Sequence, residues 1–173
     1  MSRLPLGTRT FATTVAMALL LASHAAAQAP APGMVPRDAP TKGDVIPAFE
    51  TLGIDGKASR VDFPKGSKTV LLFFLSGCPS CHKMIPEWNR AFERQPKGLR
   101  IVGVIMDQEP PGFWGTMSIR FPVLRSPGHA FLRGRNVNRA PLTLRVGEGG
   151  RVEDVALGVI DPIRLGELFA PLK

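Results

Sequence analysis

The chain has 173 residues, of which 44% are hydrophobic, with 18 glycines and 17 prolines. That length and apolar content suit one globular domain with extensions, and they exclude a collagen-like or fully disordered chain. The net charge of +8 comes from scattered lysines and arginines, without a run of five or more like charges. This pattern favours a soluble surface with a mild preference for acidic partners, and we expect no binding of nucleic acid.

Residues 1–27 have the three parts of a secretory signal peptide. Arg3 and Arg9 give a positive start, residues 11–22 form a short apolar run, and residues 25–27 supply a small-residue cleavage signal. The apolar run of about a dozen residues is shorter than the roughly 20 that a membrane-spanning helix needs. We therefore expect a cleaved signal and export to the periplasm or an equivalent compartment, with an uncleaved membrane anchor as the alternative.

Composition divides the rest of the chain into a linker and one folded domain. Residues 28–44 are rich in proline and alanine and hold almost no large apolar side chain, so they predict an extended spacer. Apolar stretches and turn signals follow, and we place the domain at residues 45–173. The chain has two cysteines, Cys78 and Cys81, so an oxidising compartment could form one disulfide within it.

Apolar runs and turn residues predict alternating strands and helices in this domain. Residues 49–52 predict a short strand before an Asp-Gly turn, and the seven residues 69–75 predict a strand buried on both faces. Helical spacing follows from residue 81 to residue 94. The remaining predicted elements are a strand at 99–106, a short helix ending near 119, an extended piece at 121–124, a helical turn at 129–135, strands at 142–146 and 152–158, and a helix from 161 onward. This order predicts an α/β fold in three layers, with a mixed central sheet flanked by helices.

The motif Cys78-Pro79-Ser80-Cys81 lies where the 69–75 strand meets the following helix. The thiolate is the reactive form of cysteine, and the unpaired amides and dipole of a helix N-terminus stabilise it. We expect Cys78, the more exposed residue, to attack a partner disulfide, and Cys81 to resolve the mixed disulfide. A purely structural disulfide is the weaker interpretation, because closing so short a loop contributes only about 2 kcal/mol.

Residues 69–86 resemble the TlpA/ResA-like branch of exported thioredoxins in the buried strand, the C-x-x-C motif and Pro86, five residues after the second cysteine. Residues 137–141, Val-Asn-Arg-Ala-Pro, resemble the segment that presents the family's cis-proline, and residues 49–63 resemble its N-terminal hairpin. The resemblance covers about 45–173. It implies a thioredoxin-like fold, protein dithiol–disulfide oxidoreductase activity without a cofactor or metal, and a cis peptide bond before the proline.

The same resemblance implies how the protein meets its partners. The backbone of Ala140 would pair with an extended substrate strand, and Pro141 and Pro79 would belong to the same substrate-binding surface. The implied partners are protein thiols and disulfides and a membrane-bound electron donor. We expect a monomer that works as a reductase.

Two positions depart from the family pattern. Gly77 stands where many relatives carry tryptophan before the first cysteine, which predicts a more open substrate groove on that side. Met84 stands three residues after the second cysteine, where an acid would be suited to take up its proton. Asp107, at the end of a predicted strand, is one candidate for that proton transfer.

Covalent haem attachment is one alternative use of this motif, because residues 78–82 also read C-x-x-C-H. His82 would then be one axial ligand, and Met106 or Met117 the other. A soluble c-type cytochrome is mostly helical, whereas this chain has several strand-like runs, and the haem alternative is therefore the less favoured one.

Two further alternatives keep the cysteines but change their task. A peroxiredoxin-like peroxidase would need threonine or serine where Leu75 stands, although Arg125 is available for its arginine. A copper-binding module would hold a soft ion on the two cysteines, with His129 as a distal ligand.

Overall fold

The structure, a computed structural model, describes residues 37–171. The predicted signal peptide and residues 28–36 of the predicted linker lie outside the described residues. Within the described range, no helix is long and apolar enough to cross a membrane.

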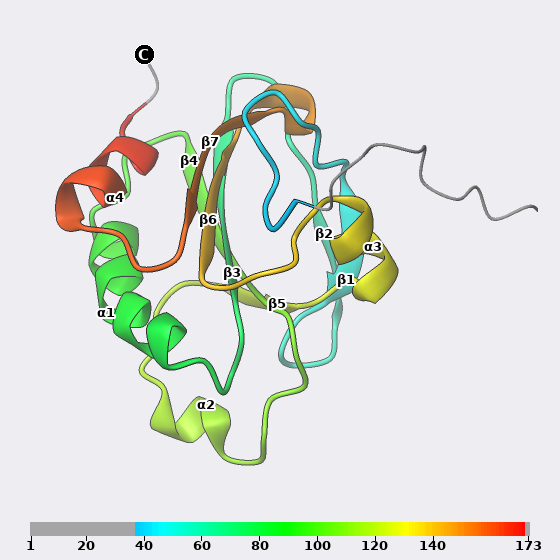
Figure 1. Ribbon diagram of the computed structural model, residues 1–173, viewed down its shortest axis with the longest axis vertical. Coiled ribbons are helices and arrows are strands. Elements are labelled where there is room, and N and C mark those ends of the chain that lie inside the picture. Colours follow the sequence, from blue (N-terminus) through cyan, green and yellow to red (C-terminus); the bar gives the residue numbers. More distant parts are fainter. Residues whose placement is uncertain (1–36, 172–173) are drawn as a thin grey trace, which may run out of the picture. The chain divides into compact units, whose positions relative to one another are not determined.

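A mixed sheet of five strands, in the order β5-β4-β3-β6-β7, forms the centre of the domain (Figure 1). The central strand β3 (Lys68–Phe74) runs parallel to β4 (Leu99–Ile105), which in turn runs parallel to β5 (Val123–Arg125). On the other side of β3, β6 (Leu142–Val146) and β7 (Val152–Leu157) follow as antiparallel neighbours. Six of the seven residues of β3 are buried. Burial on both faces is what its continuous apolar sequence predicted.

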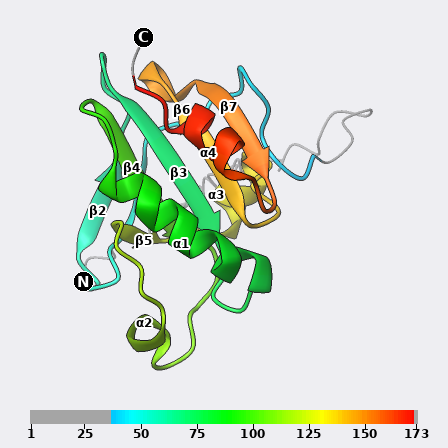
Figure 2. The same cartoon turned by 90° about the vertical axis from the view of Figure 1, so that its left-hand side faces the viewer.

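Helices cover both faces of this sheet. The helices α1 (Pro79–Glu93) and α4 (Pro162–Leu168) lie on one face (Figures 1 and 2). The other face carries α3 (His129–Gly134) and the antiparallel hairpin of β1 (Phe49–Leu52) and β2 (Ala58–Val61) (Figure 1). A further short helix, α2 (Phe113–Thr116), lies in the connection from β4 to β5. The domain is therefore the predicted three-layer α/β fold.

Alternation along β3 divides the core between these two faces. Val70, Leu72 and Phe74 pack into the cluster that α1 and α4 complete. Leu71 and Phe73 point the opposite way, into the cluster formed with the hairpin and α3. Because successive side chains of a strand point to opposite faces, one apolar run supplies both halves of the core.

The folded part of the chain begins earlier than composition predicted. Residues 37–44, expected in the linker, lie along the edge of the domain, where Pro40 is buried. The amide of Gly43 donates to the carbonyl of Val152 (2.8 Å), and the Val152 amide donates to the carbonyl of Asp44 (2.8 Å). These bonds join backbone to backbone at the open edge of β7. Pairing of this kind needs no apolar side chain, and the composition of the segment therefore did not reveal it.

One charged side chain lies almost wholly within the fold. Arg145 in β6 is 8% exposed. Its guanidinium donates to the carbonyl oxygens of Glu167, Leu168 and Pro171, and its Nε lies 3.3 Å from the Glu153 carboxylate. Since the last carbonyls of a helix lack partners within the helix, Arg145 supplies donors at the C-terminal end of α4.

We expect the substitution Arg145→Met to lower the free energy of unfolding by about 3 kcal/mol, because it leaves these carbonyls without their donor and leaves Glu153 with Lys68 alone (2.7 Å). Urea denaturation followed by circular dichroism measures the change. Arg135→Met is the matched control, since Arg135 is exposed on the surface, and we expect its effect to stay within about 0.5 kcal/mol. Equal losses in the two variants would contradict the role given to Arg145.

Candidate active site

The two cysteines lie at the junction of β3 and α1. Cys78 is the N-cap of α1, and its Sγ accepts a hydrogen bond from the backbone amide of Cys81 (3.2 Å). Cys78 is half-buried, whereas Cys81 is completely buried, and both are free thiols. The bond from Cys81 places a backbone amide of the helix start against the Cys78 sulfur. The more accessible sulfur is therefore the one to which this donor points.

A second segment approaches Cys78 from the loop between α3 and β6. The Ala140–Pro141 peptide bond is cis, as predicted. The carbonyl oxygen of Ala140 lies 4.0 Å from Cys78 Sγ, within reach of the thiol as a donor. Pro141 is buried, and its carbonyl accepts from the Gly158 amide (2.8 Å). Ala140, half-buried, and Pro79, exposed, thus contribute accessible surface near the cysteine, whereas Pro141, expected on the same surface, is buried.

Burial raises the pKa of the Cys81 thiol to about 12. Its hydrogen bond with Cys78 and the negative charges of Cys78 and Asp107 act in the same direction. At neutral pH the Cys81 thiol therefore keeps its proton. It must lose that proton before its sulfur can attack another sulfur.

Asp107 lies beside the motif, just beyond the end of β4. Its carboxylate accepts hydrogen bonds from the Ser76 backbone amide (2.9 Å) and from the Ser76 hydroxyl (2.8 Å). Ser76 belongs to the turn that leads from β3 to Cys78. The strand-end position had singled out Asp107 from the sequence. Its partner Ser76 was missed, because a serine after an apolar run carries no signal beyond its polarity.

His82 ties the same turn to the helix. Its Nε2 lies 2.6 Å from the Ser76 carbonyl oxygen, to which it donates, and its ring lies 6.5 Å from that of Phe113. Ser76 is thus bound from two sides, by Asp107 through its amide and hydroxyl and by His82 through its carbonyl. The nitrogen that a haem iron would need is engaged in this bond, which disfavours the haem alternative.

The remaining alternatives lose support from the positions of His129 and Arg125. Within residues 37–171, no group of three or more His, Cys, Asp or Glu side chains is arranged to hold a metal ion. His129 therefore does not join the two cysteines as the copper alternative requires. Arg125, which a peroxidase would use, is bound by the Glu109 carboxylate at 2.6 Å. That pairing holds the pKa of Glu109 down to about 2.

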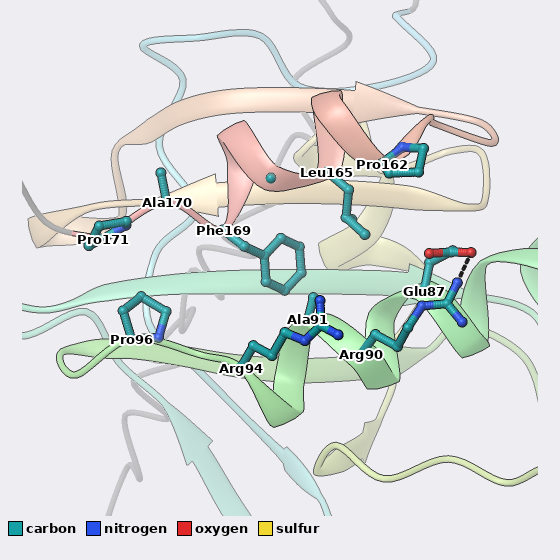
Figure 3. Close-up of a pocket in the computed structure, with 11 residues that line it drawn as sticks. Glu87, Arg90, Ala91, Arg94, Pro96, Pro162, Leu165, Phe169, Ala170 and Pro171 are labelled. Carbon is teal, nitrogen blue, oxygen red and sulfur yellow. Dashed lines mark hydrogen bonds and ion pairs between the residues drawn. The ribbon is translucent and has the colours of Figure 1, made fainter.

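A pocket of about 460 Å³ lies between the later turns of α1 on one side and α4 with the residues that follow it on the other (Figure 3). Its walls are mostly apolar, with Glu87 paired to Arg90 at one rim. Neither cysteine lines this pocket. It is therefore separate from the dithiol site.

The fold and the site define a thioredoxin-fold protein with a dithiol at the start of a helix. The chain belongs to the Redoxin family, whose model matches residues 41–164. It is similar to sporulation thiol-disulfide oxidoreductase A of Bacillus subtilis (strain 168), at 24% identity over 110 residues, which are 60% of this chain and 67% of that protein.

Solved structures agree with this assignment at the level of the fold. StoA from Bacillus subtilis has a TM-score of 0.61 at 22% identity, covering 72% of this chain and 97% of that one. The pneumococcal exposed lipoprotein thioredoxin Etrx1 from Streptococcus pneumoniae strain TIGR4 has a TM-score of 0.60 at 22% identity, covering 70% and 97%. With the family match, these likenesses confirm the predicted thioredoxin-like fold and the TlpA/ResA-like resemblance.

We expect Asp107→Asn to lower the pKa of Cys81, because the substitution removes a nearby negative charge while burial stays. The pKa should remain above neutral, since burial is its largest cause. Thiolate absorbance near 240 nm, recorded against pH in the reduced protein, measures the shift. Asp62→Asn is the matched control, since Asp62 pairs with Arg100 on the surface. An unchanged or raised Cys81 pKa in Asp107→Asn would contradict this account.

Proposed function

We propose that this protein is an exported thiol–disulfide oxidoreductase that exchanges electrons between the Cys78–Cys81 pair and protein disulfides, acting as a reductase. The observation that carries the proposal is the contrast between the two sulfurs. Cys78 is accessible and faces the Cys81 amide and the Ala140 carbonyl, whereas Cys81 is completely buried behind it. Family membership and the relatives that are thiol–disulfide oxidoreductases by name support the same chemistry.

The reaction proceeds in two exchanges. The Cys78 thiolate attacks one sulfur of the substrate disulfide, forms a mixed disulfide and releases the other substrate sulfur as a thiolate, which takes up a proton. Cys81 then loses its proton and attacks Cys78 Sγ, which forms the Cys78–Cys81 disulfide and releases the second substrate thiol. The substrate gains two electrons and the protein loses two.

Proton transfer controls the second exchange. With its pKa raised to about 12, Cys81 is a poor nucleophile until a base accepts its proton. Asp107 is the base we propose, because its charge acts on Cys81 and its carboxylate is fixed beside the motif by Ser76. The high pKa also protects Cys81 from reacting on its own, so that it acts only after Cys78 has captured a substrate.

Substrate contacts follow from the surface around Cys78. An extended segment of the substrate would lie against the backbone at Ala140, with Pro79 on its other side. Both residues reach solvent beside the sulfur, Ala140 half-buried and Pro79 exposed. Hydrogen bonds to the substrate backbone depend little on which side chains the substrate carries, which suits several protein substrates.

Export and the electron supply complete the proposal. The signal-like residues 1–27 are the support for export. A reductase in an oxidising compartment must be re-reduced after each turnover, and we propose a membrane-bound dithiol protein as its electron donor. We propose that the protein acts as a monomer.

We expect the substitution Cys81→Ser to trap disulfide-linked complexes with substrates, because the captured substrate can no longer be released by the second sulfur. Cys78→Ser is the matched variant, and it should form no such complexes, since the buried Cys81 cannot reach a protein disulfide. Non-reducing electrophoresis after incubation with a disulfide-containing protein such as insulin separates the two outcomes. Complexes with Cys78→Ser instead would reverse the assigned roles.

The direction of exchange is tested by the redox potential of the Cys78–Cys81 pair, titrated against dithiothreitol or glutathione buffers. We expect a value near or below about −250 mV, as for reductases of the thioredoxin type. A value near about −120 mV would make the protein an oxidant. A pair that cannot be cycled reversibly would contradict the oxidoreductase proposal itself.

A further inference from the structure

The loop that precedes Ala140 is held by a segment from the other end of the domain. Asn138 Nδ2 donates to the Arg37 carbonyl (2.8 Å), and the Asn138 amide donates to the Asp38 carbonyl (3.2 Å). The Arg139 guanidinium pairs with the Asp38 carboxylate at 3.0 Å. In the described part of the chain, these are all the hydrogen bonds and ion pairs that Asn138 and Arg139 make. We call residues 37–39 the brace.

The brace is itself fixed to the domain. Arg37 pairs with Asp44 at 3.0 Å, and the Thr41 amide donates to the same carboxylate (2.8 Å). This amide bond is the largest cause that holds the pKa of Asp44 below its ordinary value, so the carboxylate is charged at neutral pH. Ala39 packs against the core, and Gly43 is paired with the edge of β7. Because the brace is fixed to the domain by these contacts, it can hold the loop that it binds in place.

The loop needs such support because it carries Ala140, whose carbonyl faces the Cys78 sulfur. Ala140 follows directly after Arg139, and its carbonyl lies 4.0 Å from Cys78 Sγ. On the far side, the sheet holds the loop through the bond from the Gly158 amide to Pro141. On the near side, Val137 is buried in the core and its amide donates to the Leu132 carbonyl (2.9 Å). Between Val137 and Ala140, the polar contacts of Asn138 and Arg139 are those with the brace. Loss of the brace contacts would loosen Asn138 and Arg139, the two residues between the Val137 anchor and Ala140.

We propose that the brace positions Ala140 for protein substrates, with Asn138 as the positioning residue that binds the brace. This inference rests on the proposed function and adds a determinant of substrate binding to it. A protein disulfide must lie along the Ala140 backbone while Cys78 attacks, so its binding depends on the brace. A small disulfide needs only Cys78 Sγ, which α1 and the Cys81 amide hold independently. The brace should therefore affect protein substrates and leave small disulfides unaffected.

The key variant is Asn138→Ala, which removes the donor to the Arg37 carbonyl. Reduction of insulin, with dithiothreitol supplying electrons, should show a KM about fivefold higher at similar kcat, the factor expected for one lost hydrogen bond. Reduction of the small aromatic disulfide 5,5′-dithiobis(2-nitrobenzoate) should keep its wild-type rate. Asp38→Ala is the matched control. It removes only an ion pair whose partners are 64% and 58% exposed, and should change KM less than about twofold.

Hydrogen–deuterium exchange provides a readout that does not depend on turnover. In Asn138→Ala, exchange should rise in residues 138–140 and stay unchanged at the start of α1. Unchanged exchange in the loop, or equal loss of activity toward insulin and the small disulfide, would overturn the brace. Should Asn138→Ala fold poorly, Asn138→Asp, which places a carboxylate against the Arg37 carbonyl, is judged by the same two readouts. If the wild-type protein reduces neither substrate, the proposed function fails, and loop exchange alone then supports or overturns the brace.

Discussion

The burial of β3 on both faces decides where the chemistry of this protein can occur. Both faces of β3 are covered, and the chain reaches the surface after buried Ser76, at exposed Gly77 just before Cys78. The next residues begin α1, so the first sulfur is placed at the helix start by the packing of the strand behind it. Apolar contacts of β3 thus fix the position of the reactive Cys78 sulfur at the first turn of α1. The turn, the dithiol and the facing loop all depend on that placement.

Ser76 converts this placement into a rigid junction. Its amide and hydroxyl are bound by Asp107, and its carbonyl by His82, so that the end of β4 and the second turn of α1 both hold it. Burial is the main cause that raises the pKa of Cys81, and the charge of the same Asp107 adds to it. One carboxylate therefore fixes the turn before the first sulfur and influences the proton of the second. Structure and reactivity are coupled here through a single side chain.

Much of this arrangement could be predicted from the sequence. The parts that could not be predicted were missed for one common physical reason. The 69–75 run, the helix after the motif and the Asp161 cap of α4 were predictable because their signals are local. The Ser76–Asp107 bond joins residues 31 apart, and the Asn138–Arg37 bond joins residues 101 apart. Neither leaves a periodic pattern in the chain. Residues 37–44 were assigned to the linker for a similar reason, since their attachment uses backbone atoms, which every residue type carries.

Gly77 shows how a departure from the family pattern becomes a property of the surface. The backbone at this position does not require glycine, because the φ angle of Gly77 is not positive. A Cβ placed there would meet no described atom within 4 Å, and the residue is exposed. Packing therefore does not require glycine either, and a larger side chain would project into solvent beside Cys78. With glycine at this position, that side of the sulfur stays open. The substrate contact that we propose at Ala140, whose carbonyl lies 4.0 Å from the sulfur, then has no counterpart from a side chain at position 77, which makes the support of that loop more important in the proposed recognition.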